Sequence, residues 1–204
     1  AFNEGNRALT YFTAQLLDQL ISYAQKKDVI WIADEVFTGF GRTGKIFAAD
    51  HLTHKPDIMA LSKGLTGGTM PLGATSCAEK IISAFKTDDF LKTFFHGHSY
   101  TGNPLACATA NASFELLMKD ECAQRINAIS HKQHGFRQKI KDHPRIAEAR
   151  SLGTILAVEL KTETETSYTN EQRKKIYSFF IEREILLRPL GYDIYVWPPY
   201  AISD

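Results

Sequence analysis

Two short apolar runs, each followed at once by polar or charged residues, constrain the fold of this sequence most strongly. Residues 29–33 (VIWIA) are rich in β-branched side chains and are followed by Asp34. Residues 58–61 (IMAL) are followed by a serine and then by Lys63. Runs of this length are typical of strands that are buried on both faces in a parallel sheet. The sequence therefore predicts an α/β fold in which one strand ends at a carboxylate and another ends at an amine.

The spacing of apolar residues predicts helices around these strands. One set recurs every three or four positions, as on one face of an amphipathic helix: Leu9, Phe12, Leu16, Leu20 and Ala24. Asn103 followed by a proline is typical of a helix N-cap and the first helical position. The other elements predicted in this part of the chain are a strand over residues 71–77, a short helix over 78–86, and helices over 104–118 and 121–141.

The pattern changes after Pro144, where shorter elements predict a small α+β unit. We expect strands over residues 146–150, 154–160, 185–188 and 194–197, with a charged helix over 170–184. A domain boundary therefore falls within residues 120–145. We assign residues 1–120 to part of a larger α/β domain, and residues 121–204 to a linker helix and a small C-terminal domain.

Composition excludes several classes of function. The 24 Lys and Arg residues balance 23 Asp and Glu residues, so the charge gives no basis for binding nucleic acid or an acidic membrane. Three cysteines without a CxxC pair predict neither a disulfide framework nor a zinc site, and they favour a reducing, cytoplasmic location. We also expect no membrane-spanning helix and no signal peptide. Because the sequence begins with Ala1, we expect it to be part of a longer protein.

Lys63 and Asp34 are the first candidates for chemistry. Three of the five residues after Lys63 are glycines, which let the backbone approach a ligand closely, although the P-loop pattern is absent. An isolated lysine is usually only solvated, but one with a lowered pKa can form a Schiff base with a carbonyl compound. Asp34 could cap a helix, pair with Arg42, or hold a proton on the ring nitrogen of a pyridinium cofactor.

Two further segments could bind anions. Ser99 and Thr101 precede a predicted helix N-terminus, where a hydroxyl and backbone N–H groups favour a phosphate, unless the segment is only a tight turn. The histidines at positions 96 and 98 lack a third ligand at useful spacing, so we expect no metal. Arg188, in an apolar strand end, could grip a carboxylate with both arms of its guanidinium or form a structural ion pair.

The order of these motifs is more specific than any one of them. The segments IADEV (32–36), TGFGRTG (38–44), PDI (56–58), LSKGL (61–65) and GNPLAC (102–107) follow one another along the chain. This series resembles the class III aminotransferases, which are fold-type I enzymes that use pyridoxal 5′-phosphate. The resemblance implies that residues 1–120 form part of the large cofactor-binding domain, with its mostly parallel sheet.

The same resemblance implies a role for each matching residue. Lys63 would carry the cofactor covalently and then shuttle a proton, and Asp34 would keep the pyridine nitrogen protonated. Ser99 would contact the cofactor phosphate across a homodimer interface, with Thr101 as the weaker candidate. Arg188 would bind the carboxylate of a keto acid. The remaining matches are positions near the substrate: Tyr195, Gly97 and Arg42.

Two stretches, residues 96–107 and 185–200, are most similar to the family members that act in biotin biosynthesis. That similarity implies transamination of 8-amino-7-oxononanoate, with S-adenosylmethionine or lysine as the amino donor. The family's N-terminal half, which cradles the phosphate and stacks on the ring, has no counterpart in these residues. Two alternatives stay open: another ω-amino acid or ornithine aminotransferase, and a catalytically silent fragment that only folds or dimerises.

Overall fold

The computed structural model describes residues 13–162 and 172–203, which form two compact units. The first unit consists of residues 13–41 and 45–123. The second unit takes residues 42–44 together with the described residues from 124 onward. Residues 42–44 thus belong to the second unit, although in the sequence they lie between two parts of the first.

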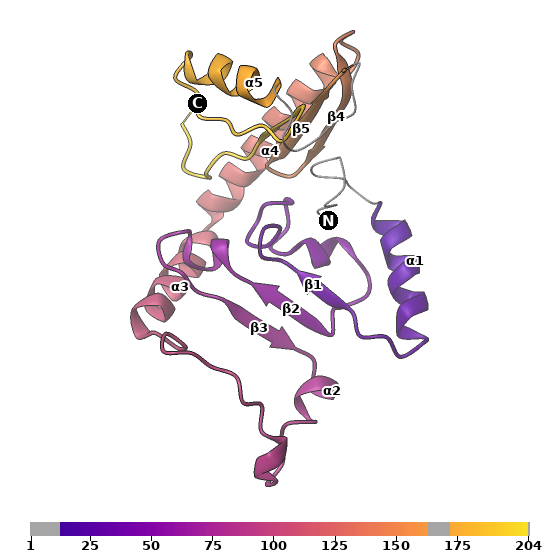
Figure 1. The fold of residues 1–204 in the computed structure, drawn as a ribbon, viewed down its shortest axis with the longest axis vertical. Helices are drawn as coiled ribbons and strands as arrows, with labels where there is room; N and C mark the ends of the chain where they lie inside the picture. Colours follow the sequence, from indigo (N-terminus) through magenta and orange to yellow (C-terminus); the bar gives the residue numbers. More distant parts are fainter. Residues whose placement is uncertain (1–12, 163–171, 204) are drawn as a thin grey trace. The chain divides into compact units, whose positions relative to one another are not determined.

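A three-stranded sheet forms the centre of the first unit. Strand β1 (Ile32–Asp34) pairs in parallel with β2 (Ile58–Leu61), and β2 pairs antiparallel with β3 (Ala74–Cys77), as Figure 1 shows. The register sets Asp34 opposite Ala60. Because β1 and β2 run in the same direction, their carboxyl ends lie at one edge of the sheet. The predicted parallel pair is therefore present.

The prediction that the first strand is buried on both faces is wrong for this chain. Within β1 only Ala33 is buried, and Ile32 is 58% exposed. Val29 and Ile30 precede the strand and are also exposed. The reason is position: β1 lies at an edge of the described sheet, with β2 as its only neighbour there. An apolar run identifies a strand, but it does not show how many neighbours the strand has.

The first helix, α1 (Ala14–Gln25), begins at Thr13, whose Oγ1 accepts a hydrogen bond from the Leu16 N–H at 3.3 Å. The predicted residues Leu9 and Phe12 lie outside the described residues. Of the predicted apolar face, Leu16 and Leu20 are exposed. Asp18 ties α1 to the sheet unit because its carboxylate accepts the N–H groups of residues 53 and 54. The Thr53 N–H in particular holds the pKa of Asp18 well below its usual range.

Helix α3 (Pro104–Leu117) begins as predicted, since Asn103 Oδ1 accepts from the N–H groups of Leu105 (2.9 Å) and Ala106 (3.3 Å). Helix α4 (Asp120–Ile140) also agrees with its prediction to within a residue at each end. The helix predicted over 78–86 is shorter, and α2 covers Glu79–Ile82. Three 3₁₀ segments complete the unit: η1 (Ala48–His51), η2 (Lys63–Thr66) and η3 (Phe90–Lys92). Across the described ranges, no helix is both long and apolar enough to cross a membrane.

The second unit is built on an antiparallel sheet in the order β4 (Ile146–Leu152), β5 (Ile155–Leu160) and β6 (Asp193–Val196). Helix α5 (Gln172–Ile181) lies between β5 and β6 in the sequence; the predicted residues 170 and 171 are not described. The strand predicted over residues 185–188 is absent: these residues are described and have no regular secondary structure. Pro189 cannot donate to a ladder, and Leu190 instead pairs with Asp193 in a tight reversal into β6.

A charge cluster around the buried side chain of Arg150 joins the three strands of this sheet. Arg150 Nη1 lies 2.8 Å from Glu148 and 3.3 Å from Glu159, and its Nη2 lies 3.4 Å from Asp193. Burial alone would lower the pKa of Arg150, but the three carboxylates, with Glu148 foremost, raise it above its usual value. The cluster therefore pins one strand to the next by charged hydrogen bonds.

Residues 42–44 pack closely against the β4–β5 turn. The Arg42 carbonyl accepts hydrogen bonds from the Thr154 N–H at 3.0 Å and from Thr154 Oγ1 at 3.2 Å. Gly153 has a φ of +56°, and a Cβ there would lie 2.3 Å from both Thr43 C and Gly44 N. Only glycine satisfies the left-handed backbone and the close approach together.

Gly153→Ala should therefore lower the free energy of unfolding by more than about 2 kcal/mol, because backbone strain and the overlap add. Urea unfolding of the full-length protein measures this effect. Gly135→Ala on α4 is the control: among the described atoms, a Cβ at that position meets nothing within 4 Å. It should stabilise the protein by about 0.5–1 kcal/mol through helix propensity. Equal effects of the two substitutions would contradict the close approach.

Asp57 fixes the start of β2. Its carboxylate accepts the Trp31 N–H at 2.8 Å and lies 2.7 Å from Lys80 Nζ, while the residue itself is buried. The hydrogen bond from Lys80 is the main cause that lowers the pKa of Asp57. A carboxyl with a lowered pKa stabilises the fold fully above its unfolded pKa of about 3.9. That contribution is lost as the pH falls through the lower pKa of the folded state.

We therefore expect the free energy of unfolding to depend less on pH below about pH 4 in Asp57→Asn than in the wild type. The amide can still accept the Trp31 N–H, but it carries no charge for Lys80. Glu182→Gln serves as a control, since Glu182 forms an exposed pair with Arg183 at 3.9 Å. The measurement is the free energy of unfolding at a series of pH values in the acid range. An equal dependence on pH in Asp57→Asn and in the wild type would refute the assignment.

Candidate functional site

Two predicted catalytic residues lie at the same edge of the first sheet. Asp34 is the last residue of β1, and Lys63 follows β2 after a single intervening serine. Both side chains are exposed. The carboxyl edge of a parallel pair is where α/β proteins usually bind ligands. The structure thus presents a carboxylate and an amine together at such an edge.

Lys63 has a strained backbone. Its φ is +44°, in the left-handed region, which costs a residue with a side chain about 1–2 kcal/mol. The surroundings hold this conformation: Ser62 Oγ donates to the Leu72 carbonyl at 2.7 Å, and a Cβ on Gly64 would lie 2.9 Å from Phe40 side-chain atoms. Strain that is held in place in this way is characteristic of functional sites.

The lysine amine lies over the turn that follows Asp34. Lys63 Nζ is 5.9 Å from the centroid of the Phe37 ring, within the range of a cation–π contact. Phe37 comes three residues after Asp34, so the lysine amine contacts the same short turn that Asp34 begins. This contact supports the expectation that the two residues act on one ligand.

Asp34 shapes its own turn. Its Oδ1 accepts the Val36 N–H at 3.0 Å, and its carbonyl accepts the Thr38 hydroxyl at 3.3 Å. The bond from the Val36 N–H forms a turn of the Asx kind, which was not among the roles considered for Asp34. Arg42, the suggested partner for an ion pair, donates instead to the Pro198 carbonyl.

Glu35 is an important residue to which the sequence analysis gave no role. Its side chain is only 1% exposed, and Oε1 accepts the Ala49 N–H at 2.7 Å. Oε2 accepts the Ala48 N–H at 3.0 Å and the Thr38 hydroxyl at 2.5 Å. The carboxylate thereby joins the turn after β1 to the start of η1. The alternation of side chains along a strand could have predicted this burial, because a residue that follows an outward-facing Asp34 faces inward.

We expect Glu35→Gln to lower the free energy of unfolding by about 1–3 kcal/mol, because the amide NH₂ would face a buried backbone N–H that it cannot satisfy. The control is Glu79→Gln, which removes an exposed ion pair with Lys86 (2.9 Å) and should cost less than about 1 kcal/mol. Urea unfolding compares the two. A loss at Glu35 no larger than the loss at Glu79 would show that its hydrogen bonds do not hold the turn.

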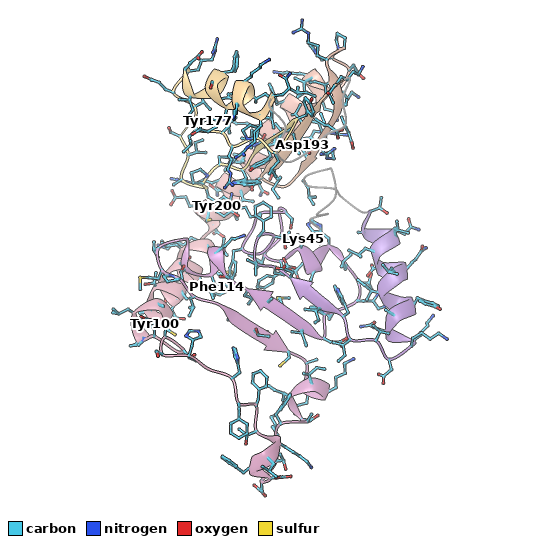
Figure 2. All side chains as sticks on the ribbon, in the orientation of Figure 1. Lys45, Tyr100, Phe114, Tyr177, Asp193 and Tyr200 are labelled. Atoms are coloured by element: carbon cyan, nitrogen blue, oxygen red, sulfur yellow. The ribbon has the colours of Figure 1, made fainter. Side chains whose placement is uncertain are left out.

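The predicted phosphate contacts lie in the segment that precedes α3. Gly97, Ser99 and Thr101 are exposed and precede α3, and Thr101 Oγ1 accepts the backbone N–H of residue 98 at 2.9 Å. Ser113, near the other end of α3, is the residue that lies 3.5 Å from the Gly64 carbonyl. Ser113 comes nine residues after Pro104, the first residue of α3, which is about 13.5 Å along the helix axis. Figure 2 labels Tyr100 and Phe114 toward these two ends.

The other predicted residues belong to the second unit. Arg42 Nη1 donates to the Pro198 carbonyl at 2.7 Å, and its guanidinium carbon lies 4.8 Å from the centroid of the Tyr200 ring. Tyr195 is buried on β6, and its ring stacks on Trp197 with a centroid distance of 4.2 Å and an interplanar angle of 19°. Arg188 is exposed in the segment before β6. Arg42 thus contacts two residues, 198 and 200, that follow Tyr195 closely in the sequence.

These side chains suit a particular kind of ligand. An exposed amine on a fixed backbone can bind a carbonyl carbon, and a carboxylate at the same sheet edge can pair with a protonated ring nitrogen. The residues therefore fit a pyridine aldehyde cofactor. Within the two described ranges, no group of three or more His, Cys, Asp or Glu side chains is placed to hold a metal ion.

Comparisons with known proteins agree with this chemistry. A family model described as aminotransferase class-III matches residues 4–204. The adenosylmethionine-8-amino-7-oxononanoate aminotransferase of Synechococcus elongatus is 40% identical over 189 residues, which cover 93% of this chain and 44% of that protein. The chain therefore spans less than half the length of this relative.

Solved structures give the same result for the fold. The structure of the adenosylmethionine-8-amino-7-oxononanoate aminotransferase from Methanocaldococcus jannaschii matches with a TM-score of 0.83 and 34% identity, over 92% of this chain and 45% of that one. An omega transaminase from Pseudomonas jessenii, solved in complex with PMP, matches with a TM-score of 0.82 and 26% identity, over 91% of this chain and 42% of that one.

Proposed function

Because this chain belongs to the class III aminotransferase family, we propose that it supplies Lys63 and Asp34 as catalytic residues of an aminotransferase that depends on pyridoxal 5′-phosphate. The observation that carries the proposal is the shared sheet edge: Asp34 ends β1, Lys63 follows β2, and the lysine amine lies over Phe37 of the intervening turn. The family uses this cofactor, and a similar structure was solved with PMP.

Each residue has a defined task in this proposal. When bound, pyridoxal 5′-phosphate supplies a ring that accepts electrons from the reacting carbon. Lys63 Nζ would hold the cofactor and would accept the proton from the substrate carbon that bears the amino group. Asp34 would accept a hydrogen bond from the ring nitrogen and would keep it protonated. Glu35 holds the turn that presents Asp34, through its bonds to η1.

The proposal extends to the substrate and to the assembly. The names of the relatives favour 8-amino-7-oxononanoate as the amine acceptor and S-adenosylmethionine as the donor. Arg188 would bind the carboxylate, with Arg42, Tyr195 and the backbone at Gly97 near the substrate. We also propose a homodimer, which membership of the class III aminotransferase family implies.

In such a dimer, Ser99, with Thr101 as the second candidate, would reach the cofactor phosphate of the other subunit. We also propose that residues 1–120 form part of the cofactor-binding large domain. Residues 121–204 would then be the linker helix and the small domain. One observation favours a second candidate function, an omega transaminase: the similarity to the Pseudomonas jessenii structure.

Lys63→Ala in the full-length protein should abolish the absorbance at about 400–430 nm that the cofactor gives when joined to lysine. It should also lower kcat by a factor of at least about 10². The matched control is Lys86→Ala, which removes only an exposed pair with Glu79. An unchanged absorbance in Lys63→Ala would overturn the assignment of the lysine, and a wild type that gains no such band on reconstitution would favour a silent protein.

A substrate assay tests the narrower part of the same proposal. We expect the full-length protein to aminate 8-amino-7-oxononanoate with S-adenosylmethionine or lysine as donor. Pyruvate and 2-oxoglutarate serve as competing acceptors. If the protein aminates these two and ignores 8-amino-7-oxononanoate, the omega transaminase is the better description.

A further inference from the structure

Lys63 lies on the loop that connects β2 with β3. The two strands are antiparallel neighbours, and their pairing ends at Leu61 and Ala74. Residues 62–73 therefore form a hairpin loop that is much longer than the usual connection of about two to five residues. Because loops of this length are ordinarily mobile, Lys63 needs contacts that fix its backbone beyond the end of the strands.

Two hydroxyl groups on either side of Lys63 provide such contacts. Ser62 Oγ donates to the Leu72 carbonyl at 2.7 Å, and Thr66 Oγ1 donates to the Met70 carbonyl at 2.5 Å. The Met70 N–H also donates to Thr66 Oγ1, at 3.4 Å. Side-chain hydrogen bonds thus join the outgoing and returning halves of the loop after the backbone pairing of the strands has ended.

Thr66 is the more enclosed of the two residues that carry these hydroxyls. It is the last residue of η2, the 3₁₀ turn that Lys63 begins, and it is only 2% exposed. Among residues 62–73, all of which the structure describes, it is the only one that is buried. A buried hydroxyl must find its partners within the protein, so Met70 fixes the end of the turn. The Gly68 N–H then donates to the Lys63 carbonyl at 3.2 Å, which returns the chain to the lysine.

We propose that Thr66 is a positioning residue for Lys63: by joining the end of η2 to Met70, it holds the left-handed backbone from which the lysine amine reaches the cofactor. The proposal rests on the function proposed above and adds a residue to it. The φ of +44° at Lys63 persists only if the surroundings hold it. An amine that is held in place before the cofactor arrives reacts faster than one that must find its position.

The kinetic test compares Thr66→Val with Thr66→Ser in the full-length holoenzyme, well below the Tm of every variant. Valine keeps the branched shape and removes the hydroxyl, whereas serine keeps the hydroxyl. We expect Thr66→Val to lower kcat about 10- to 100-fold at unchanged KM, because a displaced amine slows the chemical step. Thr66→Ser should restore kcat to near the wild-type value.

The matched control is Thr109→Val on α3. Its hydroxyl also donates to a backbone carbonyl, that of Leu105 at 2.8 Å, and its loss should leave kcat unchanged. If Thr66→Val lowers Tm but keeps the wild-type kcat, the role of Thr66 is structural only and the proposal is overturned. If Thr66→Val does not fold, Thr66→Cys, which is similar in size and only a weak donor, is judged by the same outcomes.

Labelling with pyridoxal 5′-phosphate gives a readout that needs no turnover. The full-length protein is freed of cofactor, treated briefly with this aldehyde and reduced with borohydride, and the labelled lysines are identified by mass spectrometry. In the wild type and in Thr66→Ser, we expect Lys63 to be labelled at least about 10 times faster than the exposed Lys86. In Thr66→Val this preference should fall about 10-fold.

A preference that survives unchanged in Thr66→Val would overturn the proposal, and so would a wild type that shows no preference for Lys63. A different result would separate the two proposals. If the wild type labels Lys63 selectively and Thr66→Val does not, but the wild type performs no transamination, Thr66 positions the lysine and the proposed function alone fails.

Discussion

The parallel pairing of β1 with β2 is the constraint on which the candidate site depends. The pairing sets Asp34 opposite Ala60 and brings both strand ends to one edge of the sheet. Lys63 then leaves β2 with a φ of +44°, a conformation that would relax if its neighbours allowed it. Gly64 against Phe40 and Ser62 against Leu72 prevent that relaxation. The sheet register and the strained turn together decide where the amine can lie.

The two adjacent acidic residues at the end of β1 have different roles. Asp34 is exposed and can meet a ligand, whereas Glu35 is buried and accepts three hydrogen bonds from its own unit. A buried carboxylate is tolerated only when such partners compensate for the lost water. Glu35 therefore fixes the turn, and it does so from the opposite side of the strand. This arrangement leaves the Asp34 carboxylate at the surface and holds its backbone in place.

Local signals in the sequence predicted the elements well and their surroundings poorly. The Asn103 cap, the helices from 104 and 121, and the parallel pair follow from short-range chemistry, which acts within a few residues. The exposure of Ile32 depends on strands far away in sequence, and the tight reversal at Leu190 replaces a predicted strand end. The shared sheet edge of Asp34 and Lys63 was predictable, because strand direction alone aligns the ends of β1 and β2. The burial of Glu35 follows only from the alternation of inward and outward side chains along the strand.

Residues 42–44 show why a boundary drawn along the sequence describes this chain incompletely. Gly41 donates its N–H to the Ile46 carbonyl at 3.1 Å. This hydrogen bond joins the two parts of the first unit between which residues 42–44 lie in the sequence. Thr154 and the segment that ends at Tyr200 hold Arg42 in the second unit. Arg42 follows the turn anchored by Glu35 after only a few residues. The backbone therefore leaves the first unit and returns to it within a few residues of the turn that Glu35 anchors.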